Sequence, residues 1–153
     1  MEFRRTARID APLADTWDLI DDIPTVATCI PGVTDVVMKG EREFECRVTQ
    51  KVGSVKSSFW IVAQMTGIVP AETVSIVCQG RDKVLGSNVR ATVKFDLAEQ
   101  GEATGVDIAA DFQVTGRIAT FGQRIIAAKA ERVVMRSLRN VDALLSQRRA
   151  APA

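Results

Sequence analysis

A long amphipathic segment near the C-terminus, residues 118–146, limits most strongly how this chain can fold. It contains no proline, and apolar or small residues recur every three or four positions, which is the spacing of one helical face. These residues are Ile118, Gly122, Ile126, Ala130, Val133, Ser137, Val141 and Leu144. The charged residues fall mostly on the other side: Arg124, Lys129, Glu131, Arg132, Arg136 and Arg139. The segment predicts a helix about 43 Å long, whose apolar face needs a partner because propensity alone does not stabilise it.

The residues before this helix supply the partner. Seven segments show a period-two apolar pattern typical of strands with one buried face, and short turns join most of them. The segments are residues 3–9, 36–39, 44–52, 55–65, 74–78, 89–97 and 106–114. Between the first two, Pro12 opens one short helix, and residues 23–30 form a second short helix or turn. Residues 80–87 form the longest irregular link, expected at a cavity mouth rather than as a phosphate-binding loop.

The order of these segments predicts the fold class. We expect an α+β protein with a curved antiparallel sheet of about seven strands around one long C-terminal helix, and two short helices between strands one and two. A chain of 153 residues is long enough for one well-packed domain. We assign that domain to residues 1–147 and expect a disordered tail at residues 148–153.

The amino-acid composition limits the catalytic and metal-binding chemistry that this chain can perform. Histidine and tyrosine are both absent, which excludes histidine-activated nucleophiles and most catalytic zinc sites. Acid–base chemistry would fall to Asp, Glu, Lys or Cys, and no catalytic constellation is recognisable. The net charge of +1 gives no reason to expect a nucleic-acid partner. Cys29, Cys46 and Cys78 are odd in number and lack metal-ligand spacing, so we expect a reduced cytoplasmic protein that needs no cofactor.

The space between helix and sheet is the candidate site. A long helix that crosses a curved sheet can leave a cavity, and small-molecule sites are mostly apolar. The residues expected to line it are Phe59, Ile61, Met65, Ile76, Val93, Ile108, Phe112, Ile118, Phe121, Gly122, Ile126 and Val133. Gly122, which has no side chain, would let a ligand or strand approach the helix closely. Because alternation reports burial and not emptiness, the same side chains could instead fill a solid core.

Two alternative functions, an enzyme and an adaptor, depend on a few further residues. Arg5 and Gln50 fall on the apolar side of their strands. Arg5 could extend its head into water from an edge position, or make a polar contact inside the cavity. A cyclase-like or hydrolase-like enzyme would require such a buried ionisable group. An adaptor with a filled core would instead act through its surface, with Trp60 and Val62 exposed for a partner.

Several short motifs, taken in order, resemble a known family. They are Ile9-Asp10-Ala11-Pro12 with Trp17, Cys29-Ile30-Pro31-Gly32, Lys51-Val52-Gly53-Ser54-Val55-Lys56 with Phe59, Val114-Thr115-Gly116-Arg117-Ile118-Ala119, and Phe121-Gly122-Gln123-Arg124 with Ile126. Over nearly its whole length the chain resembles the family of carbon monoxide dehydrogenase G subunits, within the START-like, polyketide-cyclase-like (helix-grip) superfamily.

The resemblance implies a nonenzymatic accessory protein. The family is associated with membrane recruitment of molybdenum hydroxylases and with an apolar ligand such as a quinone. The implied partners are a hydrophobic small molecule, quinone or lipid-like, and a molybdenum-containing dehydrogenase. Family members that act at membranes tend to carry an apolar C-terminal extension, and this sequence stops at Ala153. We therefore expect a cytoplasmic protein, at most peripheral at the inner face of the membrane.

Overall fold

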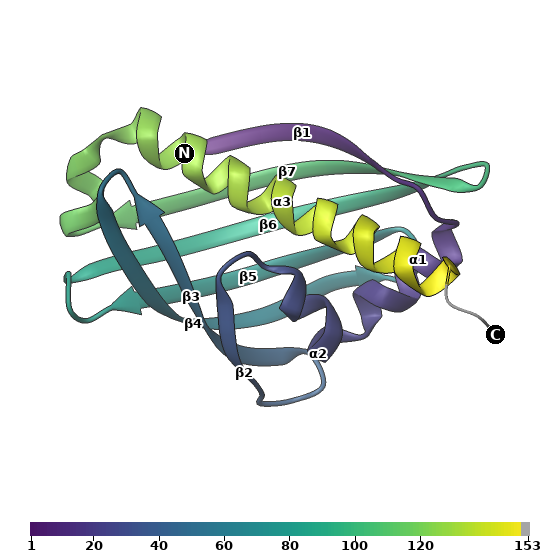
Figure 1. Ribbon diagram of the computed structural model, residues 1–153, viewed down its shortest axis with the longest axis horizontal. Helices are drawn as coiled ribbons and strands as arrows, with labels where there is room; N and C mark the ends of the chain where they lie inside the picture. Colours follow the sequence, from purple (N-terminus) through teal and green to yellow (C-terminus); the bar gives the residue numbers. More distant parts are fainter. Residues whose placement is uncertain (151–153) are drawn as a thin grey trace.

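The computed structural model describes residues 1–150 and contains one seven-stranded antiparallel sheet (Figure 1). Its strands are β1 (Glu2–Ile9), β2 (Val33–Met38), β3 (Glu43–Val52), β4 (Val55–Val69), β5 (Thr73–Asp82), β6 (Ser87–Gln100) and β7 (Ala103–Thr115). The spatial order is β1-β7-β6-β5-β4-β3-β2. Only the β1–β7 pair joins strands that are distant in the sequence, so the rest of the sheet is a simple meander.

The helices occupy the positions that the sequence predicted. They are α1 (Leu13–Asp21), α2 (Ile23–Val26), the 3-10 turns η1 (Ala27–Cys29) and η2 (Arg117–Phe121), and α3 (Gln123–Ala150). Figure 1 shows α3 running obliquely across one face of the sheet, with α1 beside its C-terminal end. The expected fold class is confirmed: a curved antiparallel sheet holds one long terminal helix, and short helices lie between the first two strands.

The long helix differs from the expectation at both ends. Residues 117–121 form a separate turn, and α3 begins only at Gln123, because Gly122 adopts a φ of 94° that a continuous helix does not allow. At the other end α3 continues through Arg148 and Arg149 to Ala150. Arginine is a good helix former and its charge is favourable at a helix C-terminus. The tail expected from residue 148 is therefore helical up to Ala150, and residues 151–153 lie outside the described residues.

The link expected at residues 80–87 is also more ordered than predicted. Strand β5 continues through Asp82 and β6 begins at Ser87, which leaves a turn of residues 83–86. The carboxylate of Asp82 accepts hydrogen bonds from the backbone N–H groups of Val84 and Leu85 at 3.0 and 3.1 Å. These local bonds close the turn, as aspartate commonly does.

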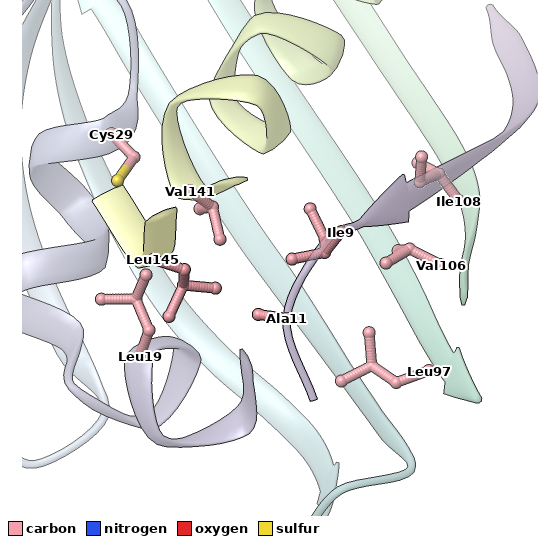
Figure 2. Close-up of a cluster of buried hydrophobic side chains, with 9 residues drawn as sticks. All are labelled: Ile9, Ala11, Leu19, Cys29, Leu97, Val106, Ile108, Val141 and Leu145. Carbon is pink, nitrogen blue, oxygen red and sulfur yellow. The ribbon is translucent and has the colours of Figure 1, made fainter. Parts of the chain in front are cut away.

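One part of the interior is solidly packed. We call it the packed cluster; it lies where α1 and the end of α3 cover strands β1, β6 and β7 (Figure 2). Its members are all at most 9% exposed: Ile9, Ala11, Leu19, Cys29, Leu97, Val106, Ile108, Val141 and Leu145. Figure 2 shows Leu145 of α3 beside Leu19 of α1. This cluster anchors the long helix at its C-terminal half.

Two findings bear on the function classes. In residues 1–150, no helix combines the length and the apolar character needed to cross a membrane. The same part of the chain brings together no group of three or more Cys, Asp or Glu side chains that could hold a metal ion.

Candidate functional site

A cavity of about 340 Å³ lies between the sheet and α3. Its walls come from the inner faces of β1 and of β3 to β7, from α1, from the α2 and η1 segment, and from one face of α3. The volume lies at the lower end of the range of small-molecule sites. Most of the predicted residues line it, namely Phe59, Ile61, Met65, Ile76, Val93, Phe112, Ile118, Ile126 and Val133.

The walls of this cavity are not fully covered by other side chains. Ile61, Ile76, Val93 and Phe95 point into the cavity from β4, β5 and β6, yet each is only half-buried. A solid core would cover such side chains almost completely, as it covers the members of the packed cluster. Five members of the packed cluster also border the cavity, so the two regions adjoin and differ in how fully their inward side chains are covered.

Three of the predicted residues lie outside the cavity lining. Ile108 is 2% exposed and belongs to the packed cluster. Phe121 is half-buried and covers Gly53, whose added Cβ would lie 3.0 Å from the phenylalanine ring. Gly122 is exposed, and an added Cβ there would meet nothing within 4 Å. The expected close approach at Gly122 is therefore wrong: its positive φ, and not crowding, requires glycine.

The two polar residues on the apolar sides of their strands have different positions. Arg5 is exposed, and its Nε and Nη2 atoms donate to the two carboxylate oxygens of Glu131 at 2.6 and 3.0 Å. This pair joins β1 to α3 on the outside, which favours the edge interpretation of Arg5. Gln50 does line the cavity, and its Nε2 donates to the Pro31 carbonyl at 2.6 Å. The amide therefore closes the wall between β3 and the loop before β2.

One charged residue, Lys129, lies in the site although the sequence did not predict it there. Lys129 was assigned to the outer side of the helix, but it is half-buried and lines the cavity. It follows Ile126 by three positions and precedes Val133 by four, so it shares their face of α3. The spacing from Ile126 and Val133 indicated an inward position, but the charge of the side chain suggested a solvated one. Burial, and then the nearby charges of Arg132 and Arg136, lower the pKa of Lys129.

The other ionisable groups of the lining are three free thiols. Cys29, Cys46 and Cys78 all face the cavity. Burial raises the pKa of Cys46 and of Cys78 to about 11, and it also raises the pKa of Cys29. Since the thiolate is the reactive form, these cysteines remain neutral at physiological pH and act as small apolar lining groups.

The exposed surface contact expected at Trp60 is only partly present. Trp60 is half-buried, its Nε1 donates to Glu45 Oε1 at 2.7 Å, and the Arg47 guanidinium lies 5.6 Å from its ring centroid. Its polar and aromatic surfaces are thus used within the protein. Val62 remains 46% exposed on the outer face of the sheet, and Val77 on the adjacent strand is 41% exposed.

Solved structures share this architecture at low sequence identity. A conserved protein from Geobacillus kaustophilus aligns with a TM-score of 0.88 and 18% identity, over 96% of each chain. The Zhui aromatase/cyclase from Streptomyces sp. R1128 gives a TM-score of 0.71 and 14% identity, over 99% of this chain and 96% of that one. A START superfamily protein from Mycobacterium smegmatis gives 0.70 and 9%, over 95% and 97%. These likenesses show the fold, which is START-like.

The sequence itself identifies the family. No protein of curated function matches it significantly. Residues 6–146, however, match the family described as the G subunit of carbon monoxide dehydrogenase (CoxG). This match covers nearly all of the sheet and most of α3, so it includes every lining residue except Phe3. The chain belongs to the CoxG family of carbon monoxide dehydrogenase G subunits.

Proposed function

We propose that this protein binds an apolar small molecule, a quinone or lipid-like compound, in the cavity beneath α3. We further propose that it serves a molybdenum-containing enzyme of the carbon monoxide dehydrogenase type. The first proposal, the ligand half, is supported by the half-buried apolar side chains on the inner face of β4, β5 and β6. The second proposal, the enzyme half, is supported by membership of the family.

The composition of the cavity wall favours an apolar occupant. Water inside it would find few hydrogen-bond partners, because nearly all lining side chains are apolar. Wall atoms that face empty space also lose dispersion contacts that a close-fitting ligand would restore. Binding of an apolar molecule restores these dispersion contacts. It also removes apolar surface from water, which contributes roughly 25 cal/mol of binding free energy for each Å².

The lining gives little support to an enzyme. Among residues 1–150, the ionisable groups of the cavity are Lys129 and the three cysteines, and no carboxylate lines it. A general acid or base of the carboxylate type would therefore have to come from outside the cavity. The fold shared with an aromatase/cyclase at 14% identity adds nothing on this point, because one fold hosts many functions.

Native mass spectrometry of the protein purified from its own host tests the ligand half. We expect a stoichiometric apolar compound that solvent extraction releases. Ala130→Phe would fill the space, since Ala130 lines the cavity from α3, and this variant should lose the compound. Ala128→Phe is the matched control, because Ala128 is exposed on the same helix and the change in helix propensity is the same.

The two halves can fail separately. If the wild-type protein carries nothing and takes up neither quinones nor long-chain lipids, the cavity has no ligand role, and the adaptor alternative replaces it. The enzyme half is tested by co-purification from host cells that express a molybdenum-containing dehydrogenase. Failure to associate with that enzyme, with or without ligand, would end the accessory proposal and leave ligand binding standing.

A further inference from the structure

Lys129 is the one charged side chain in the described lining of the cavity. None of the four ion pairs in residues 1–150 includes it, although Glu131, two positions further along α3, pairs with Arg5. A half-buried lysine side chain without a carboxylate partner is uncommon, because desolvation of its charge is costly. This side chain therefore has hydrogen-bonding capacity that the protein itself does not use.

The other polar groups of the lining are already engaged. Gln50 donates its Nε2 to the Pro31 carbonyl at 2.6 Å. Ser137 donates its hydroxyl to the Val133 carbonyl at 2.8 Å, within α3. Thr16 is fully buried, and its hydroxyl lies 3.2 Å from the hydroxyl of Thr104. A ligand that enters this cavity thus meets one free strong donor, and that donor is the lysine ammonium with its three N–H groups.

The surroundings of Lys129 favour an acceptor of negative or partly negative charge. Arg132 and Arg136 lie one and two turns further along α3, and their positive charges act on the ammonium in the same direction as its burial. An oxygen atom placed at Lys129 would relieve both effects. Hydrogen bonds to a charged donor are also stronger than neutral ones.

We propose that Lys129 donates a hydrogen bond to an oxygen atom at one end of the ligand, and that this contact selects oxygen-bearing amphiphiles over plain hydrocarbons. The inference rests on the ligand cavity of the proposed function and names the chemistry of the ligand's polar end. The shared feature is an accepting oxygen, either the carbonyl of a quinone-like or ketone group or the carboxylate of a fatty acid. The remaining walls, being apolar, hold the chain of such a molecule without further selection.

Three probes with the same number of carbon atoms test this inference: dodecanoic acid, methyl decyl ketone and dodecane. Each competes with a fluorescent apolar dye on protein freed of bound lipid. Wild-type protein should bind the two oxygen-bearing probes about tenfold more tightly than dodecane, which is the size of one charge-assisted hydrogen bond. In Lys129→Met the preference should fall to about twofold or less, while dodecane binds as well as before.

Two further variants separate the contact from general effects of charge. Lys129→Arg keeps a charged donor at the same position and should restore most of the preference. Arg124→Met removes one positive charge from an exposed position at the start of α3 and should leave the preference intact. A thermal midpoint no lower than that of the wild type would show that the fold persists in all three variants.

The outcomes are distinguishable from failure of the proposed function. If Lys129→Met keeps the full preference while all probes bind, the ammonium extends into solvent and only its stem lines the wall; the inference is then wrong and the cavity proposal stands. If no probe binds to the wild-type protein, both fail. A larger loss for the acid identifies a carboxylate end, and a larger loss for the ketone identifies a neutral carbonyl end.

Discussion

The packed cluster and the half-buried part of the cavity wall differ in how fully their inward side chains are covered, although five members of the cluster also border the cavity. Ile108 on β7 and Ile76 on β5 both lie on the inner face of the sheet, and the period-two pattern treats them alike. Ile108 is 2% exposed in the packed cluster, whereas Ile76 is half-buried in the cavity wall. The cluster has a second cover, because α1 contacts β6, β7 and α3 there. Helix α1 also borders the cavity through Thr16 and Ile20, but it makes few or no contacts with β4 and β5, where half-buried side chains line the space.

Truncation of these two isoleucines should give the largest difference between the regions. Ile108→Ala should lower the free energy of unfolding by about 2–5 kcal/mol, because it removes a fully buried side chain and leaves a cavity. Ile76→Ala should cost about 1 kcal/mol, because its side chain already faces an open space. Urea denaturation of both variants measures the two losses.

Ligand affinity should reverse the order of the two variants. Ile76→Ala removes wall surface that a ligand would touch, so it should weaken binding of a quinone or long-chain lipid by several-fold. Ile108→Ala should leave the affinity of the folded protein unchanged, because Ile108 is outside the lining. Equal losses of stability in the two variants would mean that the cavity is filled in solution and that the contrast between the regions is wrong.

The cavity region relies on a polar clamp where the packed region relies on burial. Asp82, 3% exposed, accepts hydrogen bonds from Ser57 Oγ and Ser58 N at 2.8 and 3.0 Å, besides those within its own turn. These bonds tie the β5–β6 turn to the start of β4. Asp82→Asn should lower the free energy of unfolding by about 1–3 kcal/mol, since an amide cannot accept the same set of bonds. Asp107→Asn, at an exposed position, is the control and should change stability by less than about 0.5 kcal/mol.

The effect of Asp82 should depend on pH. Burial alone would raise its pKa, but the hydrogen bonds from Leu85, Ser57, Ser58 and Val84 outweigh burial and lower it. A carboxyl group with a lowered pKa in the folded state stabilises the protein above its unfolded pKa, near 3.9, and this stabilisation is lost as the pH falls through the folded value. The difference between wild type and Asp82→Asn should therefore be constant at neutral pH and shrink below about pH 4. A gap that widens in acid would contradict this account.

The sequence predicted the strands and their faces because both depend on local periodicity. Each of the seven expected segments overlaps a strand of the structure. The boundaries were less accurate where a single backbone conformation decides them: the positive φ of Gly122 separates η2 from α3, and the side-chain bonds of Asp82 shorten the 80–87 link. Such features depend on one residue and leave no periodic trace.

The site was predictable in its composition but not in its extent. Ile76 and Val93, which the sequence predicted to bind the ligand, do line the cavity, since facing inward is a property of the strand; their contact with a ligand stays a prediction. Whether an inward side chain meets another layer depends on how far α1 extends over the sheet, which no local pattern reports. Lys129 was missed because its charge suggested a solvated face, although its spacing from Ile126 and Val133 placed it with them.

The smallest expected effect lies at the β3–β4 turn, on the side of the molecule where Asp82 forms its clamp. Lys51 and Lys56 are directly opposite each other across this hairpin, and both are exposed. Like charges in that position repel, so Lys56→Glu should raise the free energy of unfolding by about 0.2–1 kcal/mol. The gain should shrink at high salt, where exposed charges are screened. Urea denaturation at low and high salt measures it, and a gain that does not depend on salt would assign the effect to strand propensity instead. The open walls of the cavity and the like charges at this nearby turn both lower stability relative to a packed core, whereas the Asp82 clamp offsets part of that cost. A ligand that binds only the folded protein would offset more of it.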